Sequence, residues 1–218
     1  MPDNNKKYSE LRKLMVESQI KSRGVKNRRV LDAMLKVERH LFIPEALQDE
    51  AYDDHPVLIG YAQTISQPYI VAYMSEKLDI QANHKVLEVG TGCGYQTAIL
   101  CELAKEVYTI ELIKGLAANA VSTLHSLNYT NFKSLIGDAY EGWEEHAPYD
   151  RIIVTCAPSH LPEKLTEQLA ENGKMIIPYG QKFSQELVLI EKQGGKLTQK
   201  HILPVRFVPM RNKLGRIY

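Results

Sequence analysis

A short apolar run followed by three alternating glycines constrains the fold of this chain more than any other feature. Residues 86–89 read Val-Leu-Glu-Val, a pattern typical of a buried strand. Gly90, Gly92 and Gly94 follow, and residues 96–103 have the apolar spacing of a helix. Glycine is needed where the backbone turns tightly and comes close to a ligand. Strand, glycine turn and helix together predict the first unit of a nucleotide-binding α/β fold.

The spacing of the glycines distinguishes two classes of ligand. A dinucleotide fingerprint requires Gly-x-Gly-x-x-Gly, and counted from Gly90 its last position holds Tyr95. The chain has Glu-x-Gly-x-Gly-x-Gly instead, beginning at Glu88. This pattern resembles motif I of the class I S-adenosyl-L-methionine (AdoMet) methyltransferases. The resemblance implies AdoMet as the cofactor and S-adenosyl-L-homocysteine as its product.

Composition argues against several other classes of protein. The chain has 218 residues, 44% of them hydrophobic, and a net charge of +1, which suits one globular domain. This charge gives no general reason to expect a nucleic-acid or membrane partner. The N-terminus is polar and no apolar run approaches membrane-spanning length, so we expect a cytoplasmic protein. The three cysteines lack C-x-x-C spacing, which predicts reduced thiols and no metal site.

About the first 60 residues predict a helical extension that packs on the core or covers it. Apolar residues follow helical spacing over residues 8–21, a break falls at Gly24, and Asn27 is a candidate N-cap for a second helix. A further helix is expected after Ser66, a second candidate N-cap, with Pro68 in its first turn.

Strands and helices alternate beyond residue 84. Asn172-Gly173 should end the last helix, and Gly194-Gly195 should form a hairpin turn. The expected fold is a Rossmann-like, doubly wound, mostly parallel sheet with antiparallel edge strands. Residues 1–79 would form the helical extension and acceptor segment of a single domain, and residues 80–218 the AdoMet-binding core. No long apolar or heptad stripe is evident, so we expect a monomer. Strands are predicted at 85–89, 107–110, 132–136, 151–155, 174–178, 185–191 and 197–206, and helices at 95–104, 113–127 and 162–169.

Three acidic residues fall at the carboxyl ends of predicted strands, where open α/β sheets bind their ligands. Glu111 ends the second strand, and its carboxylate can accept hydrogen bonds from both ribose hydroxyls. Asp138, or the backbone beside it, can bind the adenine amino group. Glu88 can orient the glycine loop or meet the methionine ammonium through water. Each acid alone is most often a solvated or capping residue, but their common register with the glycine loop favours a cofactor site.

Five segments together resemble the protein-L-isoaspartate O-methyltransferase family, over about residues 15–210. The Gln-Thr-Ile-Ser segment is the most specific, because general methyltransferases lack it. The resemblance implies methylation of the α-carboxyl of isoaspartyl residues in damaged proteins and peptides. The ester then cyclises to a succinimide, whose hydrolysis returns some normal aspartate. The segments are residues 63–68, 88–96, 137–140, 147–150 and 204–210.

The resemblance also implies that Ser66 is the active-site residue. A free α-carboxyl has a pKa of roughly 3.5, so it is ionised at neutral pH and needs no strong general base. The sulfonium of AdoMet is already an activated leaving group. The protein must align the reacting atoms in a site with little water. We therefore expect Ser66 to hold the acceptor carboxylate in place without attacking, and capping of the next helix is its alternative or additional role.

The resemblance assigns further residues. Gln63 and Ser66, with Val208 and Pro209, are expected to bind substrate, although residues 204–210 could equally be an ordinary edge strand. The expected cofactor contacts are Thr64, Ile65, Glu88, Gly90, Thr91, Gly92, Cys93, Gly94, Gln96, Glu111, Leu112, Asp138 and Ala139.

The sequence departs from the family pattern at four positions. Ala62 and Ala139 stand where glycine is common, Cys156 replaces a common alanine, and Glu38 replaces a common proline. Ala139 adds a methyl group near the expected adenine site.

A basic run between residues 21 and 29 is expected to be a solvated face that could attract acidic peptides. Its members are Lys21, Arg23, Lys26, Arg28 and Arg29.

Two other functions stay open at this point. Another class I methyltransferase, acting on RNA or a small molecule, would explain the glycine motif and the acids but not residues 63–66. A non-catalytic AdoMet-binding protein would bind the cofactor and transfer nothing. A nicotinamide-dependent oxidoreductase is disfavoured by Tyr95.

Overall fold

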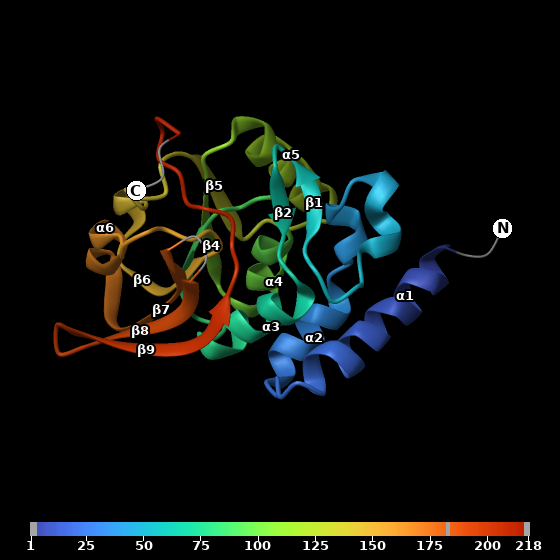
Figure 1. The fold of residues 1–218 in the computed structure, drawn as a ribbon, viewed down its shortest axis with the longest axis horizontal. Coiled ribbons are helices and arrows are strands. Elements are labelled where there is room, and N and C mark those ends of the chain that lie inside the picture. Colours follow the sequence, from blue (N-terminus) through green and yellow to red (C-terminus); the bar gives the residue numbers. More distant parts are fainter. Residues whose placement is uncertain (1–3, 182–183, 216–218) are drawn as a thin grey trace.

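A mixed sheet of seven strands, in the order β5-β4-β3-β6-β7-β8-β9, forms the centre of the molecule (Figure 1). The computed structural model describes residues 4–181 and 184–215. The strands from β5 to β7 run parallel, and β8 and β9 are antiparallel to their neighbours. This is the doubly wound sheet with an antiparallel edge that the sequence predicts. The strands are β3 (Lys85–Val89), β4 (Glu106–Glu111), β5 (Phe132–Ile136), β6 (Tyr149–Val154), β7 (Leu169–Gln181), β8 (Ser184–Gln193) and β9 (Lys196–Val205).

Both faces of the sheet are covered, which explains the nearly continuous apolar sequence of its central strands. Successive side chains point to opposite faces, so Val86 and Leu87 belong to different hydrophobic clusters. One cluster includes side chains of α3 (Pro68–Lys77), α4 (Tyr95–Leu103) and α5 (Lys114–Ser126). The other includes Leu165 of α6 (Glu163–Glu167).

The N-terminal extension packs on the core, as predicted. Its Met15 and Met34 share one cluster with Leu100 of α4. The Asn27 side chain caps α2, because it accepts hydrogen bonds from the amides of Arg29 and Val30. Among the helices of the described ranges, none is long and apolar enough to cross a membrane. The extension comprises α1 (Asn4–Leu14), the π-helical turn η1 (Met15–Lys21), α2 (Arg28–Lys36) and two 3₁₀ turns, η2 (Arg39–Phe42) and η3 (Glu45–Glu50).

A two-stranded hairpin that the sequence did not reveal precedes α3. Strand β1 (Val57–Gly60) pairs with β2 (Gln63–Ile65), apart from the main sheet. Its turn residues Tyr61 and Ala62 have φ of 51° and 55°, a conformation usually supplied by asparagine or glycine. The turn therefore lacks the asparagine and glycine residues by which a hairpin is usually recognised in a sequence.

The prediction that Ser66 caps α3 is wrong. The helix begins at Pro68, so the N-cap position falls on Gln67, which makes no side-chain capping bond. Pro68 does occupy the first turn. Ser66 is thus left outside the helix, with its hydroxyl available for another role.

The region around residue 172 also differs from expectation. The helix α6 ends at Glu167, and Asn172-Gly173 lie inside strand β7 instead of stopping a helix. The pairing of β6 with β7 shifts register there, and Asn172 adopts a left-handed φ of 61°, typical of a bulge. Gly194-Gly195 form the predicted turn between β8 and β9, with φ of 58° and 72°.

Candidate active site

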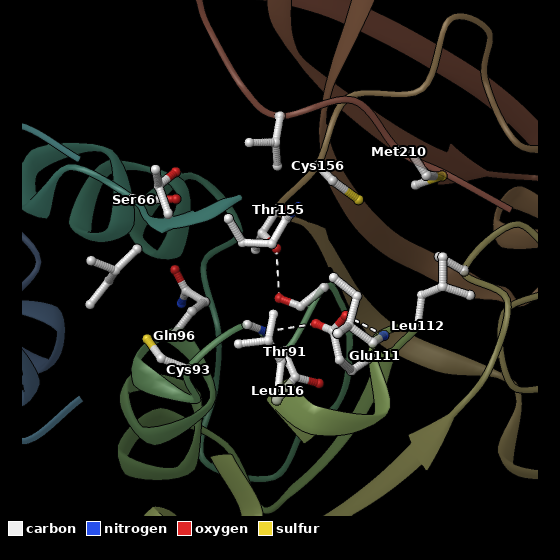
Figure 2. Close-up of a pocket in the computed structure, with 18 of the residues that line it drawn as sticks. Ser66, Thr91, Cys93, Gln96, Glu111, Leu112, Leu116, Thr155, Cys156 and Met210 are labelled. Atoms are coloured by element: carbon white, nitrogen blue, oxygen red, sulfur yellow. Dashed lines mark hydrogen bonds between the residues drawn. The ribbon is translucent and has the colours of Figure 1, made fainter. Parts of the chain in front are cut away.

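A cavity lies at the carboxyl ends of β3, β4 and β6, with the hairpin strand β2 along one side (Figure 2). Four segments far apart in sequence form most of its walls: residues 63–66, 90–96, 110–116 and 208–211. Figure 2 shows Ser66 and Glu111 on opposite walls. Every residue predicted to bind cofactor or substrate lines this cavity except Glu88, Gly94 and Asp138.

Close packing explains why the loop after β3 needs glycine. Gly90 has φ of 94°, and a Cβ there would overlap the Thr155 hydroxyl. That hydroxyl donates to the carbonyl oxygens of Val89, at 3.0 Å, and Gly90, at 2.7 Å. Gly94 has φ of 91°, and a Cβ would lie 3.3 Å from Ala120. Gly94 therefore lets α5 pack beneath the loop, and it is not among the residues that line the cavity.

Glu111 is held at the rim of the cavity by two backbone amides. Its Oε2 accepts a hydrogen bond from the amide of Gly92 at 2.8 Å, and its Oε1 accepts from Ile113 at 2.9 Å (Figure 2). The side chain is thereby fixed between the glycine loop and the start of α5. Each carboxylate oxygen keeps lone-pair capacity for a further donor. The geometry suits recognition of neighbouring hydroxyl groups.

Glu88 lies beneath the glycine loop. It is fully buried, and its Oε2 accepts hydrogen bonds from the hydroxyls of Thr97, at 2.5 Å, and Thr109, at 2.6 Å. Thr109 lies in turn 2.6 Å from the Thr91 hydroxyl in the loop. Burial raises the pKa of Glu88 to about 8. Of its two predicted roles, orientation of the loop fits this position, whereas contact with a bound ligand does not.

Asp138 also lies behind the wall. Its Oδ1 accepts a hydrogen bond from the amide of Tyr140 at 3.0 Å, and its Oδ2 from the amide of Lys213 at 2.9 Å. Ala139 lines the cavity in its place. The carboxylate thus organises the turn after β5 and anchors the chain that follows the 208–211 wall.

The acceptor segment presents two hydroxyls of a different kind. Thr64 and Ser66 line the cavity, and within the described ranges neither hydroxyl has a hydrogen-bond partner. Both also line a second, adjoining groove, together with Thr155 and Val208. Thr64 and Ser66 therefore lie at the junction of the two hollows.

Several wall residues were not among the predicted contacts, including Thr155, Cys156, Met210 and Arg211. The position of Thr155 directly after the very apolar strand β6 is the signal that could have found it. Burial raises the pKa of the Cys156 thiol to about 12 and that of the Cys93 thiol to about 11. Both thiols therefore stay protonated at neutral pH and act as uncharged walls.

Known proteins share this sequence and architecture. The model of the protein-L-isoaspartate(D-aspartate) O-methyltransferase family matches residues 10–215. Protein-L-isoaspartate O-methyltransferase of Dictyoglomus turgidum is 51% identical over 209 residues, covering 96% of this chain and 94% of the relative. That of Geobacter metallireducens is 52% identical over 205 residues, covering 94% and 95%.

Solved structures agree with this assignment. A protein-L-isoaspartate O-methyltransferase superposes with a TM-score of 0.86 at 27% identity, over 94% of this chain and 67% of that one. A Plasmodium falciparum protein described as such an enzyme, solved with S-adenosyl-L-homocysteine, gives 0.80 at 28% identity over 94% and 98%. The chain therefore belongs to the protein-L-isoaspartate(D-aspartate) O-methyltransferase family.

Proposed function

We propose that the cavity and its adjoining groove together carry out methyl transfer from AdoMet to the α-carboxyl of L-isoaspartyl residues. The cavity would hold the cofactor, and the groove would hold the damaged protein or peptide. The observation that carries this proposal is the position of Thr64 and Ser66 at the junction of the two hollows, where neither hydroxyl has a hydrogen-bond partner among the described residues. The resulting methyl ester would cyclise to a succinimide and so begin repair.

The residues around the cavity fit AdoMet. Glu111 can accept hydrogen bonds from the ribose hydroxyls on the lone pairs that Gly92 and Ile113 leave free. Apolar side chains such as Leu112 and Leu116 can flank the adenine ring. Gln96 also lines the cavity and can contact the methionine end. When bound, AdoMet supplies an activated methyl group, so these residues only need to fix its position.

The acceptor side needs donors and little water. An isoaspartyl α-carboxylate is already ionised at neutral pH, so its oxygen can attack without a general base. Ser66 and Thr64 can donate hydrogen bonds to it and aim that oxygen at the methyl carbon. Ile65 and Val208 add apolar walls that exclude water. A carboxylate beside the acceptor would repel it, and the described groove residues include none.

The three free cysteines fit an enzyme that works in the reducing cytoplasm. Its partners would be proteins and peptides that contain isoaspartyl residues. Nucleic acid and membranes are not part of this proposal, and a monomer suffices for it because one chain supplies all the walls of the site.

A methyl-transfer assay with matched peptides tests the proposal. The two peptides differ only in carrying isoaspartyl or normal aspartyl at one position. Labelling from AdoMet should appear on the isoaspartyl peptide alone. Equal labelling of both, or labelling of neither, would contradict the function, and labelling of RNA would favour the other class of methyltransferase.

A further inference from the structure

The groove that adjoins the cavity carries positive charge without a lining carboxylate among its described residues. It has a volume of about 480 Å³ and is walled by apolar side chains such as Tyr69, Leu203 and Phe207. Its two charged lining residues are Arg23, from the N-terminal extension, and Arg206, which follows β9. A peptide that places its isoaspartyl group at Ser66 would pass between these walls.

The charge of Arg23 is masked within the structure. Its Nη1 lies 3.0 Å and 3.3 Å from the two carboxylate oxygens of Asp54. Its guanidinium carbon stacks 3.7 Å from the centre of the Tyr69 ring. Gln67 donates to the same carboxylate at 2.9 Å, so Asp54 holds both side chains. Arg23 therefore stays in the groove wall with its charge largely neutralised.

Arg206 differs from Arg23 because no described residue neutralises its charge. The residue is exposed, and within residues 4–181 and 184–215 it has neither an ion pair nor a hydrogen bond from its side chain. An unpaired guanidinium beside a bound peptide attracts carboxylates over several ångströms. Arg206 is thus the residue through which the groove can sense the charge of its occupant.

The other members of the basic run at residues 21–29 do not line the groove. Arg29 donates to the carbonyls of Ile80 and Leu103, so it is a structural tether. Lys21 pairs with Glu17, and Arg28 with Asp32. Of this run, only Arg23 reaches the groove.

We propose that Arg206 makes the enzyme favour isoaspartyl substrates with an acidic neighbouring residue, and that Asp54 limits this preference by masking Arg23. This inference rests on the proposed function, because it assigns the groove to the peptide. Exposed charge pairs have small effects, so a preference of about fivefold or less is expected. It should shrink as salt is added, because counterions screen exposed charges.

Three isoaspartyl peptides that differ at one flanking position, as Glu, Gln or Lys, test the inference. The measured quantity is the ratio of kcat/KM for the Glu peptide to that for the Gln peptide. This ratio should exceed one in the native enzyme, with the Lys peptide below both. It should fall to about one in Arg206→Gln. A loss of correctly folded enzyme cancels in the ratio, so the comparison stays valid for a less stable variant.

Two further variants sharpen the test. Asp54→Asn keeps an oxygen that can accept from Gln67 but unmasks Arg23, so the ratio should rise above that of the native enzyme. Lys200→Gln is the matched control, since it removes a positive charge from exposed β9 outside the groove and should leave the ratio unchanged.

The inference would be overturned by a ratio of one in the native enzyme, by an unchanged ratio in Arg206→Gln, or by a lower ratio in Asp54→Asn. An equal fall in Lys200→Gln would also overturn it, because the effect would then be one of net charge. The proposed function fails separately, through absent methylation of the neutral Gln isoaspartyl peptide.

Discussion

The two sides of the active site are built in opposite ways. On the cofactor side, polar groups are already bonded: Glu111 holds two amides, and Thr91 is linked through Thr109 to the buried Glu88. On the acceptor side, the hydroxyls of Thr64 and Ser66 have no partner in the described part of the chain. The first side lies at the carboxyl ends of central strands of the main sheet, and the second begins on a separate two-stranded hairpin.

Because of this difference, we expect variants on the cofactor side to change AdoMet binding and variants on the acceptor side to change the rate of methyl transfer. A side chain bonded within the protein fixes the shape of the site before any ligand arrives, so its loss should affect cofactor affinity and stability together. A side chain without an internal partner adds little to the folded state, so its loss should affect mainly the reaction. Each variant below tests one side of this contrast.

Replacement of Ser66 by alanine should have the largest effect. It removes a donor to the acceptor carboxylate, and loss of one such donor lowers turnover by about a hundredfold. The AdoMet dissociation constant and the melting temperature should hardly change, because the hydroxyl has no hydrogen-bond partner among the described residues. Steady-state kinetics with an isoaspartyl peptide and calorimetric titration of AdoMet measure the two quantities. Ser126→Ala, far away on α5, serves as the control, and an unchanged rate in Ser66→Ala would refute the role assigned here.

Replacement of Glu111 by alanine should act on the cofactor side. The expected result is roughly 10- to 100-fold weaker AdoMet binding, since charged hydrogen bonds are lost and two amides are left without their acceptor. Titration calorimetry gives the affinity. Glu106→Ala, at the exposed start of the same strand, is the matched control and should bind normally. Native affinity in Glu111→Ala would break the contrast between the two sides.

Replacement of Glu88 by glutamine should change the pH dependence of stability. Burial raises the pKa of Glu88 from 4.5 to about 8, so the folded protein binds this proton more tightly than the unfolded chain. The stabilising contribution of the protonated form is complete below about pH 4.5 and is lost as pH rises through 8. Between pH 5 and 8, the free energy of unfolding should therefore fall more steeply in the native protein than in Glu88→Gln.

Urea titrations at several pH values measure this difference. Histidines with lowered pKa, such as His40, add their own pH dependence, but they are common to both proteins and cancel in the comparison. Parallel pH profiles for the two proteins would show that Glu88 is not buried in the acidic form that its surroundings favour.

Replacement of Ala62 by glycine should have the smallest effect. Ala62 has φ of 55°, a conformation that is unfavourable for any residue with a Cβ. Glycine should relieve it and raise the free energy of unfolding by about 0.5–1 kcal/mol. Ala118→Gly, within helix α5, is the control of opposite sign and should destabilise by a similar amount. Destabilisation by both changes would mean that the hairpin turn is not strained.

The elements of the sheet were predictable because their signals are local. The strands predicted at residues 85–89 and 132–136 match β3 and β5 in full, since each is a short segment with apolar residues between turn residues. Asn27 was identified as an N-cap because capping depends on only three following residues. The β1–β2 hairpin was missed because Tyr61 and Ala62 lack the usual turn chemistry, and only packing around them imposes their conformation.

The sequence by itself determined the cofactor loop and the family. Three alternating glycines after a strand indicate a tight ligand-binding turn, which is a local feature. The family pattern over residues 63–68 can likewise be recognised from the sequence alone. The tertiary structure alone decided which of the three acids reaches the cavity: Glu111 does, whereas Glu88 and Asp138 lie behind it. The tertiary structure also shows that Ser66 does not cap α3 and that Thr155 and Arg206 line the acceptor groove. These outcomes depend on contacts between residues far apart in the chain, and such contacts cannot be predicted from local sequence patterns.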